Sequence, residues 1–115
     1  MTEFQKPSWF QGFNASDVRK ALKAAKREES RIMKELQKQI GEWGVETFPT
    51  ATNRSIAQHL LEEADEVENA AKNQGIGLME ECADVLLLLL HLAHRNGFDL
   101  EQAARQKFET IRNAE

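Results

Sequence analysis

The feature that most constrains the fold is an aliphatic run from Val85 to Leu90, in which five leucines follow a valine. The run lies within a segment of helical periodicity over residues 77–95, and a helix that is apolar on every side is normally buried on every side. It is far shorter than the roughly 20 residues that a membrane span needs. A chain of 115 residues forms one domain with a thin core. We therefore expect this helix inside a helical bundle and expect subunits to associate in order to cover it.

The rest of the chain is also typical of helix. Tyrosine is absent and β-branched residues are sparse, so a sheet is not expected. We predict an all-α fold, a bundle of four to five helices assembled through helix packing between subunits, with an N-terminal arm at residues 1–15 and one domain at 16–115. The arm is interpreted either as packing on the body or a neighbour, or as a partly disordered terminus. The helices are expected at residues 16–40, 55–72, 77–95 and 99–112, with a loop at 41–54.

The first predicted helix has one apolar stripe and one basic face. Between Ser16 and Ile40 there are eight basic residues and four acidic ones. A solvated face is the favoured interpretation of this pattern, and a positive wall for a polyphosphate is the alternative. On the third helix, His91 and His94 have a spacing that a metal pair can use, but a helix-end or interface role is favoured.

Acidic residues at helical spacing form two groups on the second and third helices. Glu62 lies four residues before Glu66, and Glu63 lies three residues before it. Glu81 and Asp84 are also three residues apart. Residues three or four apart lie on one face of a helix. Glu63 is at the edge of an apolar stripe and is expected to point inward, while His59 shares the acidic face.

Carboxylates on neighbouring helices repel one another unless a cation lies between them. Four carboxylates balance two Mg²⁺ ions, and Mg²⁺ prefers oxygen ligands and binds phosphates. A site built only of acids favours Mg²⁺, with Mn²⁺ also possible, over Zn²⁺. The spacing alone is equally compatible with ordinary surface acids.

The two acidic segments together resemble the MazG-like, all-α nucleoside triphosphate pyrophosphohydrolase superfamily. They read EEADE at residues 62–66 and ECAD at 81–84, with residues 67–80 between them. The flanks EWGVETFPTATNRSIAQHLLEEADEVENA and ADVLLLLLHLAHRNGFDLEQAARQKFETIRNA are similar to small phage-type and bacterial members. The resemblance covers about residues 40–113.

The resemblance implies a role for each matching position. Glu63, Glu66, Glu81 and Asp84 would bind the metal, and Glu62 would orient or deprotonate the attacking water. The implied substrate-binding residues are the aromatic and amide side chains of a base pocket, His59 on the acidic face and two basic residues that contact phosphates: Trp43, Phe48, Asn53, His59, Lys107 and Arg112. The substrate would be a (deoxy)nucleoside triphosphate, with a purine such as dGTP or dATP as the first expectation.

Several alternatives remain open at this point. The chain can be a non-catalytic helical interaction module, or a pyrophosphohydrolase for dCTP, dUTP or phosphoribosyl-ATP. The family forms dimers and tetramers, so we expect a homotetramer ahead of a homodimer. A net charge of −4 argues against a nucleic acid polymer as partner, and no membrane partner is expected. The single Cys82 fits a cytoplasmic protein.

Overall fold

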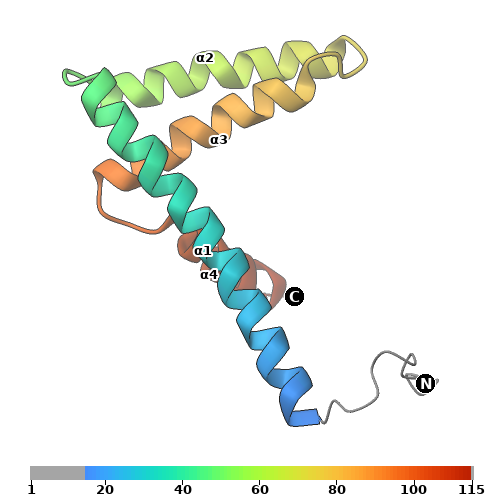
Figure 1. The fold of residues 1–115 in the computed structure, drawn as a ribbon. Coiled ribbons are helices and arrows are strands. Elements are labelled where there is room, and N and C mark those ends of the chain that lie inside the picture. The colour runs from blue at the N-terminus through green and yellow to red at the C-terminus, as the bar shows by residue number, and fades with distance from the viewer. Residues whose placement is uncertain (1–14, 115) are drawn as a thin grey trace. The chain divides into compact units, whose positions relative to one another are not determined.

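The computed structural model describes residues 15–114, apart from the side chains at positions 26 and 28–30. It contains four helices in this range, shown in Figure 1, and no strand, so the predicted all-α fold is confirmed. The helices are α1 (Ala15–Thr47), α2 (Asn53–Lys72), α3 (Leu78–Arg95) and α4 (Leu100–Arg112). The arm expected at residues 1–15 lies outside the described residues, except for Ala15 at the start of α1.

The chain divides into two units at residue 31, within α1. The described part of the first unit is a single helical segment whose basic side chains, including Arg19, Lys20 and Lys23, are exposed. The second unit, residues 32–115, contains the rest of α1 together with α2, α3 and α4. The candidate site lies wholly in this second unit.

The prediction of a loop at residues 41–54 is wrong for residues 41–47, because α1 continues to Thr47. Gly41 and Gly44 are buried inside this helix. A Cβ atom on Gly41 would lie 2.0 Å from His94 Cγ, and one on Gly44 would lie 2.5 Å from His91 Nε2. These glycines therefore allow α1 to approach α3 closely. The favoured interface role of His91 and His94 agrees with this packing.

The other helix boundaries lie within two residues of the predicted ones and are set by local capping contacts. Thr52 caps α2 through a reciprocal pair of hydrogen bonds with Ser55. Asp99 caps α4 by accepting from the backbone N–H of Gln102. Gly97, with a φ of 73°, ends α3 in a conformation that lets the Phe98 N–H donate to the carbonyl of Ala93.

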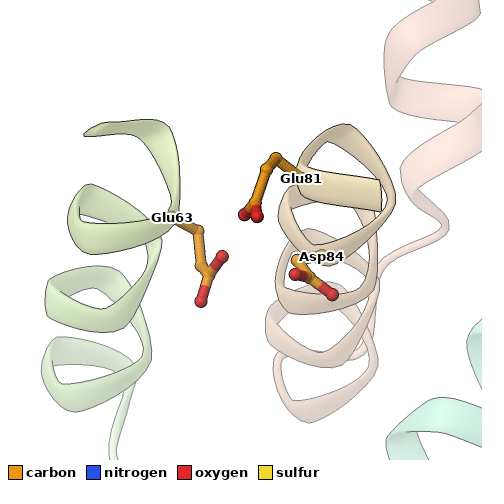
Figure 2. Close-up of side chains that lie close together, drawn as sticks. All are labelled: Glu63, Glu81 and Asp84. Carbon is orange, nitrogen blue, oxygen red and sulfur yellow. The ribbon is translucent and has the colours of Figure 1, made fainter. Parts of the chain in front are cut away.

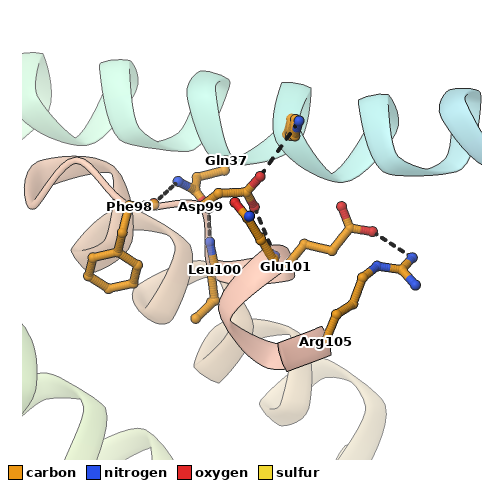
Figure 3. A network of polar contacts seen from close by, with 8 residues as sticks. Gln37, Phe98, Asp99, Leu100, Glu101 and Arg105 are labelled. Atoms are coloured by element: carbon orange, nitrogen blue, oxygen red, sulfur yellow. Dashed lines mark hydrogen bonds and ion pairs between the residues drawn. The ribbon is translucent and has the colours of Figure 1, made fainter. Parts of the chain in front are cut away.

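A small polar network attaches the connection between α3 and α4 to α1 (Figure 3). The Gln37 side chain donates to the Phe98 carbonyl at 2.7 Å and accepts from the Leu100 N–H at 3.1 Å. Lys34 lies 3.8 Å from the Asp99 carboxylate. One α1 amide thus satisfies two backbone groups that the turn leaves without helical partners.

The single chain does not cover residues 85–90 on every side, and their complete burial is expected only in an assembly of subunits. Leu90 is 1% exposed, but Leu86 is 37% exposed and the residues between them are half-buried. Apart from Gly41 and Gly44, the buried residues of the described chain are few: Ile56, Ala70, Leu90, His91 and Ala93. The predicted association of subunits would cover this apolar surface, and it stays a prediction.

The Gly41 contact predicts a loss of stability in the variant Gly41→Ala. An alanine gains about 1 kcal/mol in helix propensity over glycine, but its Cβ would meet the rigid base of the His94 side chain. Overpacking costs about 1–3 kcal/mol. We expect a net loss of up to about 2 kcal/mol and a fall in Tm of up to roughly 10 °C in thermal melting.

The double variant with His94→Gly serves as the control, because it removes both the ring and the Cβ atom that the new methyl group would meet. Gly41→Ala should be neutral or stabilising in that background. A Tm that rises for Gly41→Ala alone would show that α1 and α3 do not depend on this close approach.

Candidate functional site

Three of the predicted acidic residues converge between α2 and α3. One carboxylate oxygen from each of Glu63, Glu81 and Asp84 lies within 4.8 Å of the others. Figure 2 shows Glu63 reaching from α2 towards α3, which supplies Glu81 and Asp84. The helices are neighbours joined by a short turn after Lys72 (Figure 1). The group therefore joins Glu63 to two acids that lie 18 and 21 positions later in the chain.

Each carboxylate is placed by a local feature of its helix. The capped start of α2 fixes the helical phase that turns Glu63 inward, where its side chain is 20% exposed. Glu81 lies in the first turn of α3, where the helix dipole favours a negative charge. Asp84 follows one turn later and is exposed. The expected inward orientation of Glu63 agrees with this structure.

Burial and negative neighbours raise the pKa of Glu81. Desolvation is the largest cause, followed by the charges of Glu66, Asp84 and Glu63, and by a hydrogen bond with the Glu63 side chain. The cluster thus favours a bound positive charge, either a proton or a cation. A divalent cation would replace the proton and satisfy several oxygens at once.

The remaining two acids lie at the edge of this group. Glu66 is exposed and is not among the three converging residues, although its charge acts on Glu81. Glu62 is also exposed on α2. The predicted roles of both residues stay predictions.

A cavity of about 680 Å³ adjoins the acidic cluster and is lined by residues of α1, α2, α3 and the α1–α2 connection. Trp43 and Phe48 line it and form an edge-to-face pair, with ring centroids 5.5 Å apart and an interplanar angle of 82°. Glu63 and Asp84 belong to the same lining, as does His59. Apolar and acidic surfaces thus share one concave space.

His59 contacts the acidic cluster through Glu63, and it also lines the cavity. Its Nε2 atom lies 3.3 Å from the Glu63 Oε1 atom, one helical turn away on α2. The His59 side chain is 56% exposed.

Three predicted substrate-binding residues are not part of this lining. The Asn53 side chain forms two amide hydrogen bonds with Asn96, of 2.9 and 3.0 Å, which connect the start of α2 to the end of α3. Lys107 is exposed on α4. Arg112 is paired with both Glu109 oxygens at 2.6 Å. The single chain does not bring these three side chains to the cavity.

His91 lines the cavity although the sequence singled it out only for a helix-end or interface role. It is 7% exposed, and its Nε2 atom has no hydrogen-bond partner among the described residues. Burial, followed by the charges of Arg95 and His94, lowers the pKa of His91. The imidazole is therefore neutral at neutral pH. The sequence signal for this position is that His91 lies two helical turns after Asp84, so both side chains share the face of α3 that lines the cavity.

Carboxylates that converge from two neighbouring helices of an all-α chain, beside a cavity with aromatic walls, define a helical protein with a candidate divalent-cation site. The family model of the MazG nucleotide pyrophosphohydrolase domain matches residues 51–113, which is more than half of the chain. The chain belongs to this family. No curated protein and no solved structure matches it.

Family membership establishes the general activity class, a nucleotide pyrophosphohydrolase, which is a hydrolase acting on acid anhydrides. It also agrees with the use of a divalent metal at an acidic cluster. The matched segment contains all five predicted acidic residues but begins after Trp43 and Phe48. No helix of residues 15–114 combines the length and apolar character that crossing a membrane requires.

The raised pKa of Glu81 predicts how stability depends on pH in the metal-free protein. Below its ordinary value of 4.5, the group is protonated both folded and unfolded and has no effect. As pH rises above that value, the unfolded state ionises first, and the folded state loses stability. In EDTA, Glu81→Gln should therefore raise the Tm at about pH 7 and leave it unchanged at about pH 4.

Glu80→Gln is the matched control, because Glu80 is an exposed carboxylate in the same first turn of α3. It should not raise the Tm, since it only removes a favourable interaction with the helix dipole. Equal Tm values for wild type and Glu81→Gln at neutral pH would contradict the crowding of negative charge at Glu81.

Proposed function

We propose that this chain is a Mg²⁺-dependent nucleoside triphosphate pyrophosphohydrolase, for which Mn²⁺ can substitute. It cleaves a (deoxy)nucleoside triphosphate between the α- and β-phosphates and releases the monophosphate and pyrophosphate. The observation that carries this proposal is the convergence of Glu63, Glu81 and Asp84 within 4.8 Å beside a cavity lined by Trp43 and Phe48. The volume of about 680 Å³ is within the usual range for small-molecule sites.

The three converging oxygens suit a magnesium ion. Ligands of an octahedral Mg²⁺ lie about 2.1 Å from the ion and hence about 3–4 Å from one another. Oxygens that lie within 4.8 Å reach this geometry through small side-chain rotations. Glu66, which is exposed one turn after Glu63, completes the proposed set of four ligands.

When bound, Mg²⁺ would neutralise charge on phosphate oxygens and lower the pKa of a coordinated water. Glu62 is the proposed residue that orients this water or accepts its proton. Its exposure on α2 next to Glu63 supports a role towards the solvent side of the cluster. A bound cation would also offset the burial and the negative neighbours that raise the pKa of Glu81.

The nucleobase is proposed to lie in the cavity against Trp43 and Phe48, with His59 contacting the substrate between the aromatic and acidic parts. Asn53 would read the base edge only after its hydrogen bonds to Asn96 are broken. A purine deoxynucleotide, dGTP or dATP, is the proposed substrate, supported by the resemblance to small phage-type members. dCTP, dUTP and phosphoribosyl-ATP are the alternatives.

The assembly is proposed to be a homotetramer or a homodimer in the cytoplasm. Support comes from large apolar side chains left exposed in the single chain, among them Leu86 at 37% and Phe108 at 59%. Lys107 and Arg112 are proposed to contact phosphates from α4. Neither a nucleic acid polymer nor a membrane is a proposed partner.

The activity predicts that Mg²⁺ and a nucleoside triphosphate together yield pyrophosphate and not orthophosphate. Glu63→Gln and Asp84→Asn should each lower kcat/KM by at least about 100-fold, which is about 2.7 kcal/mol of transition-state stabilisation. The measurement is pyrophosphate release from a panel of ribo- and deoxynucleoside triphosphates. This panel also decides base and sugar preference.

Glu68→Gln is the control, because Glu68 is an exposed acid of the same helix that pairs with Lys72. It should retain activity and helicity by circular dichroism. Absence of pyrophosphate release, combined with no rise in Tm on adding Mg²⁺, would favour a non-catalytic interaction module.

The cavity predicts that Trp43 contributes to binding of the base. Removing an aromatic that stacks on a base costs about 1–3 kcal/mol, so Trp43→Ala should raise KM by about 5- to 150-fold. Trp43→Phe should retain most of the affinity. Val45→Ala is the control, since Val45 is also half-exposed on α1 but does not line the cavity. Steady-state kinetics with an unchanged KM for Trp43→Ala would place the base elsewhere.

A further inference from the structure

We propose that His59 is a positioning residue for the metal ligand Glu63, beyond any contact that it makes with substrate. The inference rests on the proposed metal site. It starts from the 3.3 Å distance between His59 Nε2 and Glu63 Oε1.

Glu63 is the carboxylate on which the geometry of the cluster depends. Glu81 and Asp84 both come from α3, and Glu63 is the one member contributed by α2. Without Glu63, the described cluster is a pair of acids on a single helix. The direction in which the Glu63 side chain points therefore decides whether a cation is held between two helices.

A free glutamate would not keep this direction. The side chain has three rotatable bonds, and holding it in one conformation costs conformational entropy. The like charges of Glu81 and Asp84 favour conformations in which Glu63 turns away. A hydrogen bond from an imidazole N–H to one carboxylate oxygen opposes both effects and leaves the other oxygen available to a metal.

A small rotation of the imidazole ring would let His59 donate this hydrogen bond to Glu63. His59 lies four residues before Glu63, so that both side chains share one face of α2. Both residues line the cavity. The Glu63 side chain is only 20% exposed, so its contact with His59 is less screened than a contact between two fully exposed groups. Hydrogen-bond partners of metal ligands typically change metal affinity by about 10- to 100-fold.

The test compares the variants His59→Leu and His59→Gln without nucleotide. Leucine fills similar space and has no donor, whereas glutamine retains a nitrogen donor of similar reach. The readout is Mn²⁺ affinity, measured by electron paramagnetic resonance of free Mn²⁺, with circular dichroism to verify helicity. His59→Leu should weaken Mn²⁺ binding by about 10- to 100-fold, and His59→Gln should stay within about threefold of wild type.

The matched control is Lys72→Leu, which removes the other side-chain ion pair at the same spacing on α2, the 2.6 Å contact between Lys72 and Glu68. This pair lies outside the cluster. Lys72→Leu should leave Mn²⁺ affinity unchanged. A loss equal to that of His59→Leu would mean that helix stability is responsible, and would overturn the positioning role.

Glu63→Gln separates failure of this inference from failure of the proposed function. If Glu63→Gln abolishes Mn²⁺ binding while His59→Leu binds like wild type, the result supports the proposed metal site and contradicts the positioning role of His59. If Glu63→Gln also binds like wild type, the result contradicts both the metal site and the positioning role. A variant His59→Leu with a raised KM but normal Mn²⁺ affinity would assign His59 to substrate contact alone.

Discussion

Repulsion between carboxylates across the α2–α3 interface is the constraint on which the site depends. One oxygen from each of Glu63, Glu81 and Asp84 lies within 4.8 Å of the others, and burial together with these negative neighbours raises the pKa of Glu81. The packing of two helices sustains this arrangement, because neither helix can turn its acidic face away without exposing its apolar one. The energy stored in this way is released when a cation binds, so affinity for metal and strain in the metal-free protein have the same origin.

The rest of the second unit holds α2 and α3 at the spacing that the cluster needs. At one end, the Asn53–Asn96 amide pair connects the two helices. On another side, Gly41 and Gly44 let α1 approach α3 closely enough to close the cavity wall. The Gln37 contacts then fix the turn into α4. These contacts compensate for a core that contains few fully buried residues.

Features that depend on residues close together in the chain could be predicted from the sequence. Caps such as Asp99 and the three- and four-residue spacing of acids depend on neighbours along the chain, so helix ends and the acidic faces were predictable. The prediction of a loop from Gly41 onward was wrong, because the reason for a glycine inside this helix lies in His94, more than 50 residues away. The Asn53–Asn96 pair also joins residues 43 positions apart, so no pattern of neighbouring residues predicts it. Burial of residues 85–90 depends on surfaces that the single chain does not supply.

Charge balance sets a further requirement on the proposed reaction. Two Mg²⁺ ions neutralise about four ligand carboxylates, which leaves the charge of a triphosphate to be balanced by other groups. None of the described residues that line the cavity is a lysine or an arginine. In the proposed reaction, the phosphates would therefore extend beyond the cavity towards basic side chains elsewhere in the assembly, for which the exposed Lys107 on α4 is the candidate.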